Sequence, residues 1–502
     1  MHQKYNFLLI CQRFIKTMVS LYEQPNTSMT VNEFYLQLKH TFPFDVTLKQ
    51  DAFLNKIARF VLSENQDELF VLKGYAGTGK TTLLSNLVNQ LALVHLKYVM
   101  LAPTGRAAKV ISNYAKQPAH TIHKKIYYPK KDKNSGLAFT MQANKHKNTI
   151  FIVDESSMIS DNVTDATMYT HGSLLDDLMY YVYSGQNCKL IIVGDTAQLP
   201  PVGMDESPAL LESKLALHYL MKVDHIELTE VMRQEEGSGI LYNATELREQ
   251  LQQEFFDFFA FDLKPFRDII RLQDGYETLD AIHDAFSRKG SEETIFIVRS
   301  NKRANQYNQQ IRMRVLDLES ELSSGDYIMV VKNNYFWLKD SKAADFIANG
   351  DILEILQIYR HHELYGFRFA SVKVRMVDYP DLAPFDTIVM LDTLNSESAS
   401  LTYEQSNRLY QEVLLDYEDE TTAYRRMQKV KNNEYFNALQ IKFAYAVTCH
   451  KSQGGQWDTV FIEQPYLPDG ISKDYMRWLY TALTRAKEKV YLIGFNDEFF
   501  DE

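Results

Sequence analysis

The chain has 502 residues, 45% of them hydrophobic and 24% charged, so it has enough apolar side chain for packed cores and is not a disordered or collagen-like polymer. At about 150 residues per domain, this length predicts three or more folded units. Its three cysteines are far apart and form no CxxC pair, which excludes a disulfide scaffold and a cysteine-based zinc module and favours a reducing compartment.

The formal charge of −11 argues at first against a polyanionic partner. Binding to phosphate depends, however, on where the positive charges lie and not on their sum. Residues 104–147 contain ten lysines and arginines but one acidic residue, Asp132. We expect this basic window to contact phosphate; a merely solvated lysine-rich face is the alternative.

Residues 1–47 carry no motif and are expected to form an N-terminal extension. Their apolar run, Phe7–Cys11, is interrupted by Gln12 and Arg13 before it reaches the length of a signal peptide or a membrane span. We therefore expect a cytoplasmic protein without a membrane partner.

From residue 68 onward, short apolar strands alternate with helices, a pattern typical of a parallel sheet built from βαβ units. The pattern weakens after residue 233 and resumes with a strand near 294, which predicts a second α/β unit that continues to the end of the chain. Three segments between residues 354 and 391 have the composition of antiparallel strands and predict a small inserted β-barrel.

The segment Asp392–Glu420 follows these strands and has eight acidic residues and one arginine, Arg408. We interpret it as a solvated helical extension of the barrel. The alternative is an acidic surface that repels DNA and braces the neighbouring domains.

The residues from Gly74 to Thr81 match GxxxxGK[ST] between a predicted strand and a predicted helix, the context typical of a phosphate-binding loop. In such a loop the backbone N–H groups point at the phosphates, at the positive end of the helix dipole. Lys80 would reach the β- and γ-phosphates of ATP, and the Thr81 hydroxyl would bind Mg²⁺. The remaining residues assigned to nucleotide binding in this loop are Gly77, Thr78, Gly79 and Thr82.

An acidic pair, Asp154 and Glu155, follows the apolar run IFIV and therefore lies at the carboxyl end of a predicted strand, where open α/β sheets bind ligands. Asp154 would hold the Mg²⁺ ion, and Glu155 would act as general base toward the attacking water.

Three further side chains have the chemistry to act on the γ-phosphate. Gln198, in GDTAQLPPVG after a third strand, can hydrogen-bond a phosphate or a water. Arg233 in LTEVMRQ and Arg485 in YTALTRAKEK are candidates to stabilise the transition-state charge that the loop alone leaves unpaired.

Ten motifs in a fixed order, taken together, resemble the superfamily 1 DNA helicases of the RecD-like branch. They are GYAGTGKTT, LAPTGRAAKV, TIHKKI, IVDESSM, VGDTAQLPPVG, LTEVMRQ, VRSNKRANQYN, GDYIMVVKNN with FIANGD, YAVTCHKSQGGQWD and LYTALTRAKEKV. The PTGRAAK and HKSQG forms are similar to this branch and not to the UvrD/Rep branch.

The resemblance implies an α/β fold with two RecA-like P-loop parallel-sheet domains. The first would span residues 48–235, with a basic pin domain inserted at 104–149. The second would span residues 236–502, with an SH3-like β-barrel and helical insertion at 351–440.

The resemblance also assigns roles to single residues. Gln50 would read adenine, and Gln453 and Gly455 would relay the nucleotide state to DNA. The residues implied to face the DNA strand are Thr104, His123, Asn301 and His450.

The segment IYYPKKDKNSGLAFTM would form the strand-separating hairpin. Two interpretations of Phe139 in it are equally open. It stacks on a base, an interaction worth about 1–3 kcal/mol, or it packs in the core of the small domain, as aromatic residues of hairpins commonly do.

The resemblance predicts an ATP-dependent DNA helicase that requires Mg²⁺, translocates 5′ to 3′ on single-stranded DNA and unwinds duplex DNA with a single-stranded tail. Two alternatives stay open: a RecD-type motor subunit of a nuclease complex or DNA-protein remodeller, and a P-loop ATPase with a substrate other than nucleic acid. Single-strand-binding, replication or repair proteins are the expected protein partners.

Overall fold

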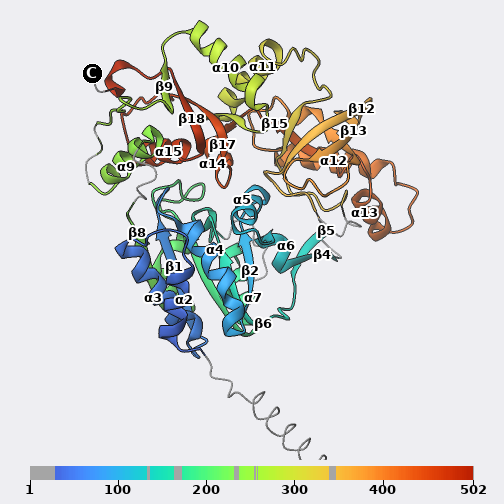
Figure 1. Cartoon of the computed structure of the whole chain (residues 1–502). Coiled ribbons are helices and arrows are strands. Elements are labelled where there is room, and N and C mark those ends of the chain that lie inside the picture. Colours follow the sequence, from blue (N-terminus) through green and yellow to red (C-terminus); the bar gives the residue numbers. More distant parts are fainter. Residues whose placement is uncertain are drawn as a thin grey trace, which may run out of the picture.

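The structure, a computed structural model, describes residues 29–132, 136–162, 172–230, 237–253, 256, 258–338 and 346–500, with the backbone alone for 128–132 and 136–139. The chain forms two lobes, each with its own sheet, and a barrel attached to the second (Figure 1). No helix in this described part is long and apolar enough to cross a membrane.

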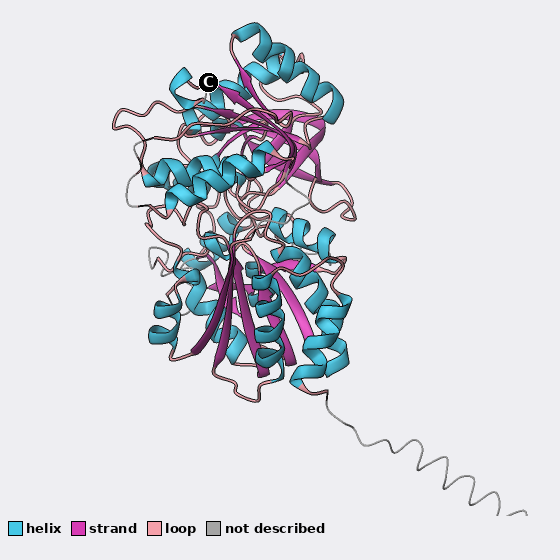
Figure 2. Ribbon diagram, turned by 60° about the vertical axis from the view of Figure 1, so that its left-hand side comes forward, coloured by secondary structure: helices cyan, strands magenta, loops and turns pink. Residues whose placement is uncertain are grey.

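The first sheet has six parallel strands in the order β3-β2-β6-β7-β1-β8 and confirms the predicted parallel arrangement. Its central strands are continuous apolar runs because helices cover both faces of the sheet; Figure 2 shows these helices on either side. The strands are β1 (Glu68–Gly74), β2 (Lys97–Ala102), β3 (Ala119–Thr121), β6 (Lys147–Val153), β7 (Gln186–Gly194) and β8 (Lys222–Leu228).

Successive residues of β1 serve opposite cores, as the strand repeat of two requires. Phe70 packs under the helices α2 (Val31–Thr41), α3 (Leu48–Leu62), α4 (Lys80–Gln90) and α5 (Gly105–Ala115). Val71 packs against α6 (Ile122–Ile126), α7 (Leu174–Tyr183) and α8 (Glu212–Tyr219) on the other face. Helix α2 belongs to the segment without a motif, yet Phe34 and Leu38 are fully buried in the first core.

A two-stranded antiparallel hairpin, β4 (Tyr127–Asp132) with β5 (Gly136–Met141), leaves the first lobe between α6 and β6. Its register runs from the Tyr127 and Met141 pair to the Asp132 and Gly136 pair. The hairpin occupies the segment from which the sequence predicts a pin.

The second sheet has five parallel strands in the order β16-β10-β17-β18-β9. The strands are β9 (Ile269–Leu272), β10 (Thr294–Val298), β16 (Ala446–Thr448), β17 (Trp457–Glu463) and β18 (Ala486–Ile493). The helices of this lobe are α9 (Gly239–Leu251), α10 (Gly275–Lys289), α11 (Asn301–Arg314), α14 (Cys449–Ser452) and α15 (Lys473–Leu483). The fold is therefore two RecA-like α/β domains, as predicted.

A closed five-stranded barrel confirms the predicted β insertion. It takes one strand from before the expected strands and one from after them. The last strand closes the barrel by pairing parallel with the fourth strand and antiparallel with the first. The strands are β11 (Tyr327–Val330), β12 (Ile352–Leu364), β13 (Phe367–Met376), β14 (Phe385–Met390) and β15 (Leu439–Phe443).

The acidic segment folds onto this barrel as α12 (Tyr403–Leu415), followed by α13 (Ala423–Lys431). Leu409 and Val413 of α12 are buried against barrel residues, whereas its acidic side chains Glu404 and Glu412 are exposed. This is the arrangement of a solvated amphipathic helix.

Candidate active site

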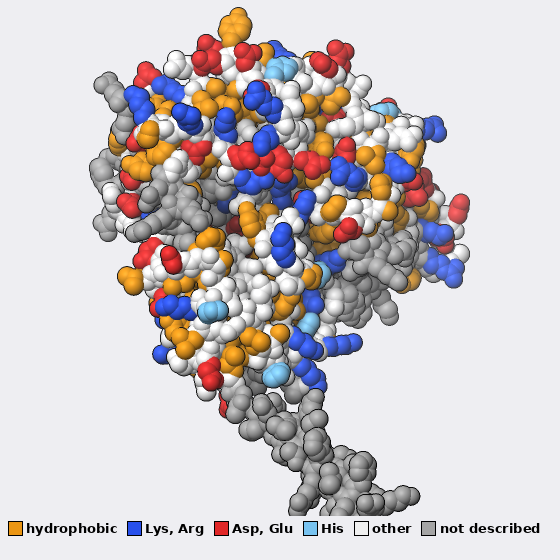
Figure 3. Space-filling model, in the orientation of Figure 1, with side chains coloured by type: hydrophobic (Ala, Val, Ile, Leu, Met, Phe, Trp, Pro, Cys, Tyr) orange, Lys and Arg blue, Asp and Glu red, His pale blue; other side chains and the backbone are white. Residues whose placement is uncertain are grey.

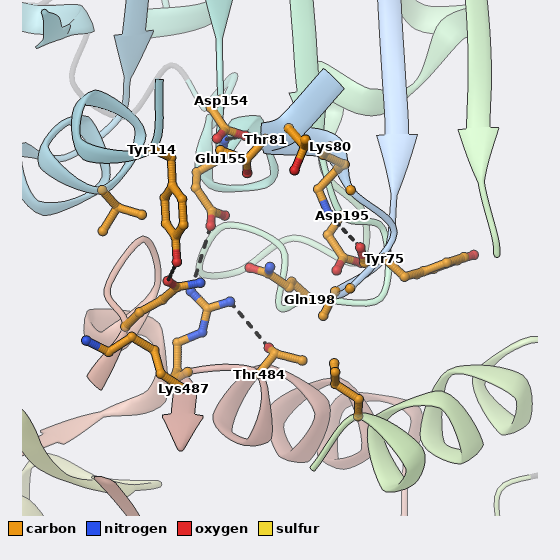
Figure 4. Close-up of a pocket in the computed structure, with 18 of the residues that line it drawn as sticks. Tyr75, Lys80, Thr81, Tyr114, Asp154, Glu155, Asp195, Gln198, Thr484 and Lys487 are labelled. Carbon is orange, nitrogen blue, oxygen red and sulfur yellow. Dashed lines mark hydrogen bonds and ion pairs between the residues drawn. The ribbon is translucent and has the colours of Figure 1, made fainter. Parts of the chain in front are cut away.

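A cavity of about 500 Å³ lies between the two lobes and is lined by residues of both (Figure 4). The strands β1, β6 and β7 end at it, because in parallel sheets the carboxyl ends of the strands lie along one edge. The first lobe contributes the P-loop, the acidic pair and Gln198, and the second lobe contributes Thr484, Arg485, Ala486 and Lys487.

The P-loop has the backbone conformation that its glycines permit. Gly77 and Gly79 have φ angles of 74° and 83°, in the left-handed region that disfavours other residues. A Cβ at Gly79 would lie 2.8 Å from Gln50 Nε2, and one at Gly74 would lie 2.9 Å from Thr78 Oγ1. Both the fold of the loop and its close packing therefore require glycine.

Lys80 is the first residue of α4 and bends back over the P-loop. Its ammonium group donates hydrogen bonds to the carbonyl oxygens of Gly74, at 2.5 Å, and Tyr75, at 2.8 Å. Bound phosphates would replace these neutral carbonyls with charged oxygens, which bind an ammonium group more strongly.

Asp154 is held at the end of β6 and accepts the Glu155 N–H at Oδ1, at 2.9 Å. Burial, together with the charge of Glu155, raises the pKa of Asp154 to about 6. A cation at this carboxylate would stabilise its charged form and lower that pKa. With the Thr81 hydroxyl on the same cavity, the donor set is made of oxygen ligands, the kind that Mg²⁺ prefers.

Gln198 lies in the loop after β7 and lines the cavity. Its Oε1 atom is buried and has no hydrogen-bond partner within the described residues. A buried polar atom of this kind usually has a partner, so its position on the cavity suits an interaction with a bound group or a water.

Helix α15 of the second lobe contacts two motifs of the first. The Tyr480 hydroxyl accepts a hydrogen bond from the P-loop N–H of Ala76 at 2.9 Å, and Thr481 Oγ1 accepts one from Leu199 N at 2.9 Å. Just beyond the helix, Arg485 Nη1 lies 3.8 Å from Glu155 Oε1 and 3.3 Å from the carbonyl oxygen of Gly455. The structure thus brings Arg485 to the acidic pair, and its role at the γ-phosphate stays a prediction.

The segment after α14 also lies along the boundary between the two lobes. Gln453 Nε2 donates a hydrogen bond to Leu199 O at 2.7 Å, beside the loop that carries Gln198. Gly454 and Gln456 line the cavity. The predicted relay residues Gln453 and Gly455 are therefore chain neighbours of residues that line the cavity, and Gln453 contacts the first lobe.

Gln50 lies behind the P-loop and is 1% exposed, and it is absent from the described cavity lining. Its Nε2 donates to Thr78 O at 3.1 Å, and its Oε1 accepts from Thr47 N in the capping box of α3. In this structure the Gln50 side chain supports the P-loop, and its adenine-reading role stays a prediction.

Aromatic residues that sequence reasoning missed also line the cavity: Phe42, Phe44, Tyr75 and Tyr114. Phe42 and Phe44 come from the segment without a motif and pack edge to face at 6.2 Å. A short apolar pair after a helix is too common a pattern to have identified them.

Arg233 lies outside the described residues, and so does the Phe139 side chain, so the interpretations of both stay as predicted. Of the other predicted DNA-facing residues, Thr104 caps α5 by accepting the Ala107 N–H at 3.2 Å, and Asn301 Nδ2 donates to the Glu397 carbonyl oxygen. Burial lowers the pKa of His123 to about 4 and also lowers the pKa of His450.

Thr104 lies against the second lobe, since a Cβ at Gly454 would be 3.1 Å from its Oγ1. The structure therefore brings the start of α5 close to the segment that follows His450. None of these four predicted DNA-facing residues is among the described residues that line the cavity between the lobes.

Comparison with known proteins agrees with this geometry. A family model described as an AAA domain matches residues 55–261, and one described as a UvrD-like helicase C-terminal domain matches residues 443–493. The ATP-dependent DNA helicase dda of Enterobacteria phage T4 is 21% identical over 449 residues, covering 84% of this chain and 93% of its own. The chain is similar to superfamily 1 helicases of the Dda and RecD type.

Further relatives differ in how much of their length the chain spans. The ATP-dependent RecD2 DNA helicase of Deinococcus radiodurans is 30% identical over 214 residues, which is 41% of this chain and 26% of that protein. Uncharacterized protein R530 of Acanthamoeba polyphaga mimivirus is 24% identical over 510 residues, 88% of this chain and 98% of its own. A Bacteroides Pif1 helicase solved with ADP-AlF3 and ssDNA has a TM-score of 0.46 at 17% identity, covering 91% of this chain and 95% of that one.

Proposed function

We propose that the chain is an ATP-dependent DNA helicase that translocates 5′ to 3′ on single-stranded DNA and unwinds duplex DNA ahead of it. The observation that carries the proposal is a single cavity lined by the P-loop and acidic pair of one lobe and by Arg485 of the other. Such a cavity is complete only when the lobes are together, so hydrolysis can be coupled to their relative movement.

The predicted site residues on this cavity divide the work of ATP hydrolysis among them. Lys80 and the P-loop amides would bind the phosphates, and Thr81 and Asp154 would hold Mg²⁺, which would neutralise phosphate charge. Glu155 accepts the proton of the attacking water, while Gln198 orients the water or the γ-phosphate. Arg485 stabilises the charge that develops on the transferred phosphoryl group.

The contacts of α15 and of Arg485 just after it support coupling between the lobes. Arg485 and Tyr480 reach the first lobe through Glu155 and the Ala76 N–H. Loss of the γ-phosphate would remove an anion from between Arg485 and the P-loop and weaken their attraction. The lobes would then separate and close again on the next ATP, moving the DNA strand past the boundary where Thr104 and His450 lie.

The domain division proposed for this cycle places the first RecA-like domain at 48–235 with the pin at 104–149, and the second at 236–502 with the insertion at 351–440. Arg233 is proposed as a second γ-phosphate ligand and Gln50 as the adenine reader. The DNA-facing residues are proposed to be Thr104, His123, Phe139, Asn301 and His450.

The direction of movement rests on the RecD-like form of the motifs. It is tested with the purified chain on two duplexes that differ only in carrying a 5′ or a 3′ single-stranded tail, with ATP turnover measured on each. We expect single-stranded DNA to stimulate turnover and the 5′-tailed duplex to be unwound. Unwinding of the 3′-tailed duplex alone would overturn the direction.

Two other outcomes of this experiment correspond to the alternative functions. Stimulated turnover without unwinding would favour a motor subunit or remodeller that needs partners. Turnover that DNA leaves unchanged would favour an ATPase with a substrate other than nucleic acid.

A further inference from the structure

A second, open hollow of about 730 Å³ lies on the first lobe, apart from the nucleotide cavity, and the two share no described lining residue. It is formed by the end of β3, helix α6, the connection from β5 to β6, and α7. Its described lining residues include no acidic one; they are His120, Lys124, Lys125, Gln142, Ala143, Lys145, His146 and Tyr181.

The hollow gathers basic side chains whose charged forms are disfavoured by burial and by neighbouring lysines. Burial lowers the pKa of Lys125, which means that the protein surroundings disfavour its charged form. Burial and the charges of Lys124 and Lys125 also lower the pKa of His120, and burial with the charges of Lys125 and Lys97 lowers that of His146. An anion placed in the hollow would favour the charged form of each of these groups.

The wall of the hollow is held by hydrogen bonds. Gln142 Nε2 donates to Tyr127 O at 2.7 Å, and Asn144 Nδ2 donates to Tyr181 O at 2.9 Å. The His146 N–H donates to Asn144 Oδ1 at 2.9 Å, and the His146 ring packs edge-on against Phe151. The connection from β5 to β6 is therefore fixed against α7, and the basic surface exists before any ligand arrives.

The hollow lies at the foot of the β4–β5 hairpin, where the Gln142 N–H donates to Ile126 O at 2.8 Å. Figure 1 shows the hairpin between the barrel with its helices above and the connection to β6 below. Figure 3 shows lysine, arginine and histidine side chains gathered on this flank of the first lobe. In this view the barrel and its helices lie above the hairpin, and the connection that lines the hollow lies below it.

We propose that this hollow binds the sugar–phosphate backbone of the displaced strand after the hairpin has parted it from the strand in the cleft. The inference rests on the proposed helicase function. A strand that runs along the boundary of the lobes cannot also occupy the outer flank, so the hollow is available to the other strand. Its lysines can neutralise phosphate charges, which repeat regularly along a nucleic-acid backbone.

The test compares two duplexes with the same 5′ tail on the tracking strand, one of which also has an unpaired 3′ tail on the displaced strand. The variant Lys124→Gln/Lys125→Gln/Lys145→Gln removes three charges from the hollow. The matched control, Lys49→Gln/Lys264→Gln/Lys489→Gln, removes three charges elsewhere. Binding is measured over a range of salt concentrations, together with unwinding and ATP turnover on single-stranded DNA.

We expect the wild-type chain and the control to bind the forked duplex more tightly than the singly tailed one. The salt slope for the fork should be steeper by about 2, from three phosphate contacts at about 0.7 each. The hollow variant should lose this difference and keep its turnover on single-stranded DNA, and the corresponding Lys→Arg variant should restore the difference.

The proposal is overturned if the wild-type chain gains nothing from the displaced-strand tail, or if the hollow variant keeps the whole gain. An equal loss of DNA-stimulated turnover in the hollow variant would overturn it too, because the lysines would then contact the tracking strand. Failure of the helicase function itself is recognised separately, by wild-type turnover that single-stranded DNA does not stimulate.

Discussion

The Tyr480 hydroxyl donates a hydrogen bond of 2.6 Å to Asp195 Oδ2, although the tyrosine belongs to the second lobe and the aspartate to the first. The same oxygen accepts the P-loop N–H of Ala76. Burial raises the pKa of Tyr480 well above its usual value, so the hydroxyl stays protonated and able to donate. One side chain therefore joins α15 to two loops of the nucleotide site.

Replacing Tyr480 by Phe should lower the turnover number for ATP hydrolysis by about tenfold. Both hydrogen bonds are lost while the ring still packs, and the loss of a buried bond to a charged group costs on the order of 1.5–3 kcal/mol. Steady-state kinetics with saturating DNA would measure the effect. Tyr475→Phe is the control, since it removes a hydrogen bond to Gln464 from the same helix away from the cavity; equal losses in both variants would contradict a role at the site.

The substitution Glu155→Gln should leave ATP bound but almost uncleaved, because the amide keeps the shape of the side chain and cannot accept the proton of water. Equilibrium binding of a fluorescent ATP analogue and single-turnover hydrolysis would separate the two effects. Glu212→Gln, which breaks an ion pair with Lys73 in the same lobe, is the control. Normal hydrolysis by the Glu155 variant would place the general base elsewhere.

The substitution Arg485→Ala should reduce turnover on the order of 10³-fold or more, as expected for an arginine that stabilises the transferred phosphoryl group. Lys487→Ala tests whether any cation on the cavity matters, since Lys487 lines the same cavity and is paired with Glu293 and Asp458. Rates of ATP hydrolysis for both variants check the prediction. A change of only a few-fold for Arg485 would reduce it to a structural residue.

We expect the free energy of unfolding to depend on pH through Asp351, which is buried where α5 meets the barrel. A Cβ at Gly105 would lie 2.5 Å from its Oδ1, and that oxygen has no hydrogen-bond partner in the described part of the chain. Burial, with a smaller effect of the Asp378 charge, raises the pKa of Asp351 to about 7. The folded chain therefore holds a proton that the unfolded chain releases near pH 4.

This raised pKa should make the free energy of unfolding fall as the pH rises from about 4 to about 7, by up to about 1.4 kcal/mol per pH unit, and level off above. Asp351→Asn should flatten that part of the profile and stabilise the fold most above pH 7. Denaturant unfolding at pH 5.5 and 7.5 would measure the difference. The exposed Asp280→Asn is the control, and parallel profiles for wild type and Asp351→Asn would contradict the prediction.

Much of the fold could be predicted because its signals are local. The runs FVL and IFIV are apolar at every position, which predicts strands buried on both faces, and GYAGTGKTT identifies the P-loop from its glycines and Lys80. The complete barrel was harder to predict from the sequence, since β11 and β15 are short and are separated by more than a hundred residues.

By itself, the sequence determined the two α/β units, the P-loop, the acidic pair and the order of the motifs, because each depends on residues adjacent in the chain. Only the tertiary structure decided which side chains meet across the lobes. Tyr480 reaches Ala76 over a separation of 404 residues, and Gln50 packs behind the P-loop instead of lining the cavity. The basic hollow likewise joins β3, α6 and α7. Such contacts depend on how whole elements pack, which no local pattern of residues records.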